Sequence, residues 1–189
     1  MAADNFWTNA GPGIKDPKRQ YRFLVYLEGM EGGATWYAKS AKKPEITITT
    51  VEHNYLNHKF YYPGRTEWGE VQVVLVDPVS PDAAAETAAI IQAAGYHPPV
   101  DATDVTTMSK SEAVKNLLGV RIVQIDSTGV ELEAWALKNA FITSVSYGDL
   151  DYSGDDLTEV TIGLRYDWAE LTSDVAADGK KKFFNQGGS

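Results

Sequence analysis

Alternation of apolar and polar side chains in short segments is the feature that most limits how this chain can fold. Every second side chain near the end of the body is apolar: Val160, Ile162, Leu164, Tyr166 and Trp168. The residues between them are Glu159, Thr161, Gly163, Arg165 and Asp167. Because successive side chains of a strand point to opposite faces, residues 157–168 are predicted to form one strand with one buried face. Residues 21–28 repeat the same period of two.

Turn residues separate further short segments of this kind. Strands are expected at residues 36–39, 46–51, 59–62, 70–76, 121–125, 130–135 and 141–147. The sequence Asp126-Ser127-Thr128-Gly129 favours a hairpin between two of them, and a loop over 148–156 joins the last pair. About eight short strands predict a mainly β protein, an antiparallel β-sandwich or barrel.

One α-helix is expected to pack on these strands. Ser80 is predicted to cap it, Pro81 to take the first helical position and Gly95 to end it. A second, shorter helix is allowed over residues 111–118, where Ser109 and Glu112 have the spacing of a capping box.

Length and composition predict one domain. Its 189 residues divide into an N-terminal arm at 1–20, a β domain at 21–171 and a mobile C-terminal tail at 172–189. The formal net charge of −9 argues against a surface that grips nucleic acid phosphates. No apolar run approaches the ~18 residues of a membrane span, so no membrane partner is expected. The chain contains no cysteine, which excludes disulfides and thiolate metal sites.

No motif in the sequence predicts catalysis. His53 and His58 lack an evident third ligand, and hydrogen-bonding histidines on a polar loop are the favoured interpretation over a metal site. The aspartates of residues 149–156 do not have EF-hand spacing, so a solvated acidic turn is favoured over a calcium loop. We therefore expect no enzyme activity and no cofactor.

Three stretches together indicate a family. A strand at 22–27 leads to a short polar segment and proline at 38–44, and the basic-aromatic segment 57–68 precedes the strand 71–77. The third stretch, 132–168, includes Leu137-Lys138-Asn139-Ala140-Phe141 and the closing strand. In this order they resemble the tail tube protein family of contractile-tailed bacteriophages, over residues 20–171.

The resemblance implies a structural subunit. Members of the family form hexameric rings that stack into a tube inside a sheath, and their strands join into a continuous β-barrel. The implied partners are other copies of the chain, the tail sheath protein, and the baseplate and tail terminator proteins. The resemblance also implies that DNA passes through the lumen without specific binding, and that the protein resides in the virion tail after assembly in the host cytoplasm.

Candidate assembly residues follow from the same resemblance. The residues expected to contact the next ring are His53, Asn54, Tyr55, Asn57 and His58. The lumen candidates are the charged residues of long, otherwise apolar strands: Glu131, Glu133, Glu159 and Asp167. Some of these acids could instead lie between subunits, paired with a base such as Arg121 or Arg165.

Two alternative functions stay open at this stage. The chain could form the inner tube of a contractile injection system or a type VI-like secretion system. It could also be a carbohydrate-binding β-sandwich, provided that Tyr61, Tyr62, Trp68 and Trp135 share one open face.

Overall fold

The computed structural model describes residues 17–30, 37–101, 107–174 and 180–186. Most of the predicted arm, including Phe6 and Trp7, lies outside this range. The strands are β1 (Phe23–Leu27), β2 (Ala38–Ala41), β3 (Ile46–Tyr55), β4 (His58–Trp68), β5 (Val71–Val76), β6 (Val120–Ile125), β7 (Glu131–Lys138), β8 (Phe141–Ser146), β9 (Glu159–Arg165), β10 (Trp168–Ser173) and β11 (Lys181–Phe183). The helices are α1 (Ala83–Ala93) and α2 (Lys110–Leu117).

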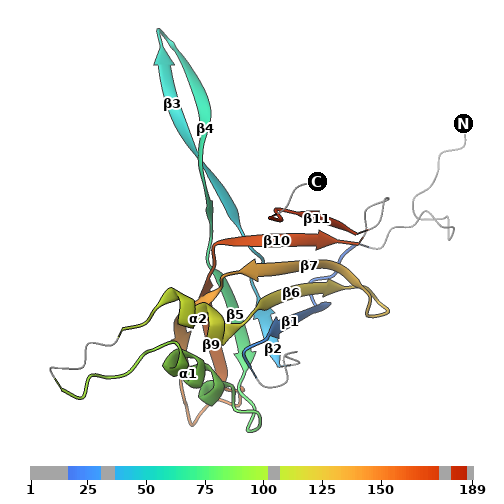
Figure 1. The fold of residues 1–189 in the computed structure, drawn as a ribbon. Coiled ribbons are helices and arrows are strands. Elements are labelled where there is room, and N and C mark those ends of the chain that lie inside the picture. Colours follow the sequence, from blue (N-terminus) through green and yellow to red (C-terminus); the bar gives the residue numbers. More distant parts are fainter. Residues whose placement is uncertain (1–16, 31–36, 102–106, 175–179, 187–189) are drawn as a thin grey trace, which may run out of the picture.

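The strands form two sheets and a separate hairpin, and all pairs are antiparallel. One sheet has the order β1-β6-β7-β10-β11 and the other the order β2-β5-β9-β8, while β3 pairs only with β4. Figure 1 shows the two sheets running in clearly different directions and the hairpin projecting far from both. The predicted hairpins β6–β7 and β8–β9 are confirmed.

A single apolar core lies between the two sheets. Val25 and Ile122 enter it from the five-stranded sheet, and Leu75 and Ile162 enter it from the four-stranded sheet. Ile90 of α1 joins the same cluster. The predicted antiparallel sandwich with a packed helix is therefore confirmed, with α2 as a second helix.

The prediction of one long strand over residues 157–168 is wrong in one respect. It divides into β9 and β10, which belong to different sheets. At the break, the Asp167 amide donates to the carbonyl of Lys138 at 3.0 Å instead of continuing the β8–β9 ladder. Tyr166 and Ala169 are both buried on either side of it, so the core accepts apolar side chains from both strands.

The hairpin β3–β4 is longer than predicted. The sequence predicts a polar loop around His53 and His58, whereas the strands continue to a two-residue turn at Leu56 and Asn57. Leu56 occupies the left-handed region with φ 53°. Every residue of β3 is exposed, so this segment has no core face, and beyond Val51 it lacks the alternation that marks a half-buried strand.

Both helices have clear N-terminal caps. Asp82, not Ser80, caps α1, and its carboxylate accepts a hydrogen bond from the Ala85 amide at 2.8 Å. Pro81, predicted at the first helical position, therefore lies before the helix. The charged carboxylate of Asp82 interacts more favourably with the positive end of the helix dipole than the neutral hydroxyl of Ser80 would. In α2 the predicted cap is confirmed, since Ser109 Oγ accepts from the Glu112 amide at 3.2 Å.

The end of the described chain adds an edge strand. Residues 181–183, which the sequence assigned to a separate tail, form β11 and pair with β10 in the register Leu171↔Phe183. The domain boundaries themselves stay predictions. Within the described ranges, neither helix is long and apolar enough to cross a membrane.

Candidate assembly surfaces

The four-stranded sheet has two open edges. Its outer strands are β2 and β8, and no strand among the described residues pairs with their outer sides. The Lys42 amide donates to the Gln72 carbonyl at 2.8 Å, and Ala41 lies opposite Val73 in the same register. Because hydrogen-bonded and non-bonded pairs alternate, the amide of Ala41 points away from β5. This edge can therefore pair with another strand.

The face of the four-stranded sheet that is turned away from the core is mostly polar. On β5 it carries Gln72 beside the half-buried Val74 and Val76, and on β9 it carries Glu159, Thr161 and Arg165. Charges on and beside this face are paired: Lys39 contacts Glu159, and Arg165 lies 3.2 Å from Glu67. The hydrogen bond from Lys39 and its positive charge hold Glu159 beside it, and the same contact raises the pKa of Lys39.

The structure brings the five ring-contact candidates together at the tip of the hairpin. His53, Asn54 and Tyr55 lie on β3 opposite Phe60, Lys59 and His58 of β4, and Asn57 is in the turn. All five are exposed. Apolar side chains accompany them, because Leu56 is 90% exposed and Tyr55 64% exposed. A role in ring contacts stays a prediction for each of these residues.

The root of the hairpin is anchored to the sandwich. Trp68, at the end of β4, packs against the core, with its ring 6.0 Å from that of Tyr166. The ring of Phe184 meets Trp68 edge-on at 5.5 Å. The Gly69 amide also donates to the Glu45 carbonyl at 2.8 Å. The projecting strands therefore start from a fixed base.

The four lumen candidates do not share one sheet. Glu131 and Glu133 lie on β7 of the five-stranded sheet, Glu159 lies on β9 of the other sheet, and Asp167 lies between β9 and β10. Asp167 accepts hydrogen bonds from Lys110 at 2.6 Å and from Asn139 at 2.7 Å, and these contacts lower its pKa. Glu131 lies 3.5 Å from Arg121. The lumen assignment stays a prediction.

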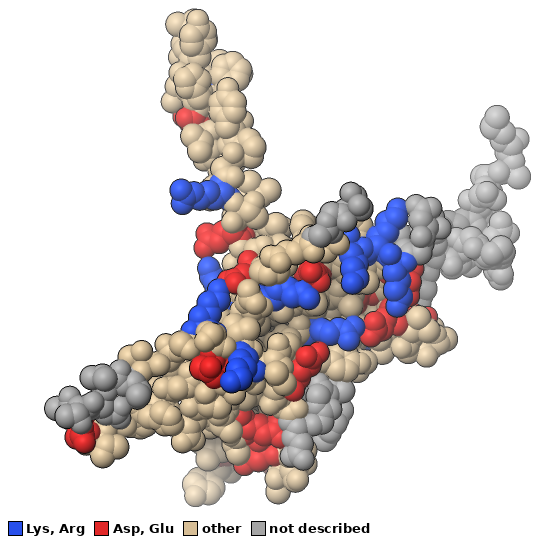
Figure 2. All heavy atoms as spheres, viewed as in Figure 1, with Lys and Arg blue, Asp and Glu red and all other residues tan. Residues whose placement is uncertain are grey.

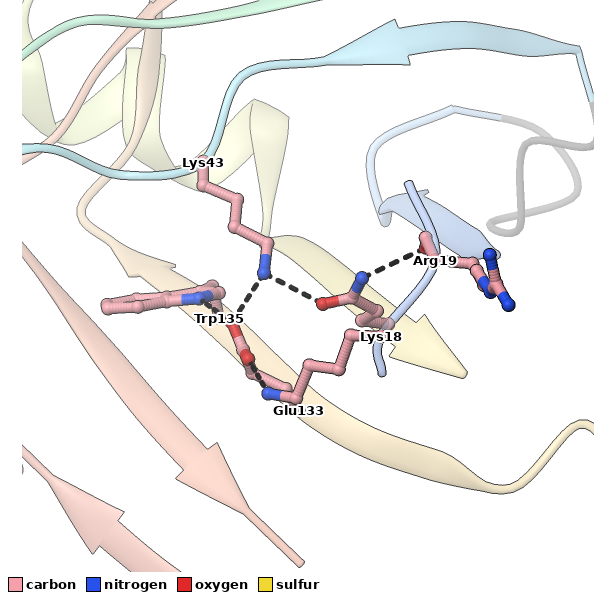
Figure 3. Close-up of polar contacts among 6 residues, drawn as sticks. Lys18, Arg19, Lys43, Glu133 and Trp135 are labelled. Atoms are coloured by element: carbon pink, nitrogen blue, oxygen red, sulfur yellow. Dashed lines mark hydrogen bonds and ion pairs between the residues drawn. The ribbon is translucent and has the colours of Figure 1, made fainter. Parts of the chain in front are cut away.

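Glu133 is the centre of a partly buried polar network that the sequence did not reveal (Figure 3). Its carboxylate accepts hydrogen bonds from Lys43 at 2.7 Å, from the indole of Trp135 at 2.7 Å and from Lys18. Burial favours the neutral acid, but the hydrogen bonds from Lys18, Lys43 and Trp135 outweigh it and lower the pKa of Glu133 to about 2.

The same network holds the N-terminal segment on the sheet. Lys43 also donates to the side-chain oxygen of Gln124 at 2.9 Å, and Gln124 donates in turn to the Arg19 carbonyl at 3.1 Å. Lys18 and Glu133 are 115 positions apart in sequence, so no local pattern could have indicated their contact. The network fixes the place at which the chain enters the domain.

The aromatic residues of the carbohydrate-binding alternative are spread over different places. Tyr61 and Tyr62 are exposed on the hairpin, whereas Trp68 and Trp135 pack against the core. They form no single open face. Among the described residues, no cluster of three or more histidine, aspartate or glutamate side chains is arranged to hold a metal ion.

Comparison with known proteins identifies the fold. No protein-family model and no curated protein matches the sequence. A chain in the structure of the anti-feeding prophage cap, the cap that terminates its tube, is 19% identical, with a TM-score of 0.63 over 92% of this chain and 99% of that one. A chain in the sheath-tube complex of the extracellular contractile injection system PVC is 17% identical, with a TM-score of 0.60 over 85% and 94%.

A third similar structure is the baseplate of the anti-feeding prophage. Its matching chain is 13% identical, with a TM-score of 0.61 over 83% of this chain and 96% of that one. The fold defined by the two sheets and the projecting hairpin is thus one found in contractile injection systems. The predicted resemblance to contractile tail tube proteins is confirmed at the level of the fold.

Proposed function

We propose that this protein is a structural subunit of the tube of a contractile tail or injection machine. The observation that carries the proposal is a sandwich whose four-stranded sheet is open at both edges, in a fold shared with chains of sheath-tube, cap and baseplate structures. Open edges expose unpaired backbone groups to other chains, and a closed ring of subunits would pair them.

In this proposal β8 of one subunit pairs with β2 of the next, and six subunits close a ring. The four-stranded sheets then form a continuous barrel, with the polar face that carries Gln72 turned to the lumen. The hairpin tip of each subunit contacts the adjacent ring. Sheath, baseplate and terminator proteins are the further partners, and the role is structural, not catalytic.

The cargo distinguishes two versions of this function. In a phage tail, located in the virion, the lumen would pass DNA without binding it, and an excess of acidic groups would repel phosphates. In an injection system the lumen would pass a protein. The similar structures from the anti-feeding prophage and PVC favour the second version. Neighbouring genes for capsid and terminase would indicate a phage, and genes for a toxin and an ATPase an injection system.

Substitution of Ala41 by proline tests the ring contact. Proline removes the amide that points outward from β2 and leaves the Lys42–Gln72 hydrogen bond in place. The partner carbonyl loses its donor, which costs about 1–3 kcal/mol per contact. The association constant between subunits should fall about 5- to 150-fold.

The matched control is Ala41→Ser, which keeps the amide and a small side chain. Sedimentation velocity over a concentration series measures both variants, and thermal unfolding checks that each monomer is folded. Normal assembly of Ala41→Pro would rule out pairing through the edge of β2. Loss of assembly in both variants would show that the side chain, not the amide, matters.

A further inference from the structure

Charge is strongly segregated in this chain. Residues 66–109 contain seven acidic residues and residues 139–164 contain five, and neither segment contains a lysine or arginine. These segments include α1 and the connection from β8 to β9, at the bottom of Figure 1. Figure 2 shows acidic but no basic side chains at that lowest end, whereas lysines and arginines gather over the five-stranded sheet. The molecule therefore has an acidic end.

The connection from β8 to β9 encloses a recess at this end. The recess has a volume of about 590 Å³, and its walls include Asp149, Leu150, Asp151, Tyr152, Asp156 and Leu157. Leu150 is 89% exposed and Leu157 70% exposed, although both are large and apolar. Among the described residues, no lysine or arginine forms a direct ion pair with the aspartates of this connection, and Lys39, which pairs with Glu159, acts on Asp156 only through its charge. A recess lined by both aspartates and exposed apolar side chains suits a basic segment that also carries apolar side chains.

The chain itself contains such a segment. Residues 180–184 are three lysines followed by Phe183 and Phe184, and we call them the basic strand because they include β11. Phe183 is 45% exposed and Phe184 52% exposed. Lys180 lies 3.6 Å from the carboxylate of Asp174. Charge and apolar content are thus complementary between the basic strand and the recess.

The recess and the basic strand cannot meet within one copy. β11 is held to β10 at the edge of the five-stranded sheet, and it lies in the upper half of Figure 1, far from the β8–β9 connection. Two different surfaces at separate ends of the same molecule make a heterologous contact, which builds an open polymer when its rotation does not close a ring.

We propose that the basic strand of one subunit binds the recess at the acidic end of a subunit in the adjacent ring. Phe183 enters between Leu150 and Leu157, and the lysines face the aspartates. This contact rests on the proposed tube function and adds to it a specific stacking surface, separate from the hairpin tip.

Two charge-reversed variants test this contact. The first carries Asp149→Lys and Asp156→Lys, both in the wall of the recess, and the second carries Lys181→Glu and Lys182→Glu. When the first variant assembles alone, lysines in the recess face the lysines of the basic strand. When the second assembles alone, glutamates on the strand face the aspartates of the recess. This repulsion should raise the critical concentration for polymerisation of each variant about tenfold or more. An equal mixture of the two restores both pairings, because subunits of alternating type then meet with opposite charges. The mixture should polymerise nearly as well as the wild type.

A control variant separates local effects from net charge. Glu28→Lys with Glu112→Lys changes the net charge as much as the first variant does, at exposed acids that lie outside the proposed contacts. It should polymerise almost normally. Sedimentation velocity and electron microscopy measure all samples, and recovery in the mixture also shows that both variants are folded.

Each outcome decides the proposal. If the wild type polymerises but the mixture does not recover, or if neither charge-reversed variant is impaired, the stacking contact is wrong while the tube function stands. A wild type that forms no oligomer contradicts the tube function together with this contact.

Discussion

Replacement of Glu133 by glutamine should destabilise the protein in a way that depends on pH. The hydrogen bonds to Glu133 lower its pKa from 4.5 to about 2 in the folded state. A depressed carboxyl pKa stabilises the fold above the unfolded pKa, and this stabilisation disappears as the pH falls through the folded pKa. If the whole pKa shift of Glu133 contributed to stability, it would add about 3 kcal/mol to the free energy of unfolding at pH 7 and about 1 kcal/mol at pH 3.

Solvent reduces that magnitude, because the side chains of Lys18 and Lys43 are 40% and 45% exposed. We expect Glu133→Gln to lose about 1–3 kcal/mol of unfolding free energy at pH 7, and distinctly less at pH 3. Urea unfolding of both proteins at the two pH values measures this difference.

The control is Glu131→Gln on the same strand, where the carboxylate lies 3.5 Å from the Arg121 guanidinium at the surface. It should change the unfolding free energy by less than about 1 kcal/mol. A loss for Glu133→Gln that is equal at pH 7 and pH 3 would refute the role of the ionised carboxylate. No loss at pH 7 would refute the network as a source of stability.

Three further substitutions test the packing by thermal or urea unfolding. Gly29→Ala should lower the unfolding free energy by about 1–3 kcal/mol, because a Cβ there would lie 2.5 Å from the Asn116 carbonyl oxygen. Gly154→Ala should be nearly neutral, because its Cβ would lie 3.9 Å from the nearest atom, the Asp151 carbonyl oxygen. Ser109→Ala should cost about 0.5–2 kcal/mol through loss of the α2 cap, and an unchanged midpoint would exclude that role. Leu75→Ala should cost about 2–5 kcal/mol because the side chain is fully buried, and a smaller cost would mean that the core collapses around it.

Segments with a buried face could be predicted well from the sequence. The pairs β6–β7 and β8–β9 were found because their strands alternate and a turn separates them. The break at Asp167 was missed because apolar side chains keep the same alternation from Val160 to Trp168, through the change of sheet. A period of two reports which face is buried but not which sheet a strand joins.

The assembly surfaces were harder to predict than the core. The tip of the hairpin is exposed on both sides in one subunit, so its strands lack a core-facing pattern and His53 to His58 resembled a loop. The network around Glu133 joins residues up to 115 positions apart, which no motif records. The acidic end was visible in principle, since two long stretches of the sequence lack lysine and arginine.

Electron microscopy of the purified wild-type protein over a concentration series tests the central claim most directly. Subunits that close rings through the edges of β2 and β8 should appear as rings, and as hollow tubes of uniform bore when the concentration rises. Dispersed monomers at every concentration, even with a ring-forming seed from a baseplate, would contradict a tube subunit.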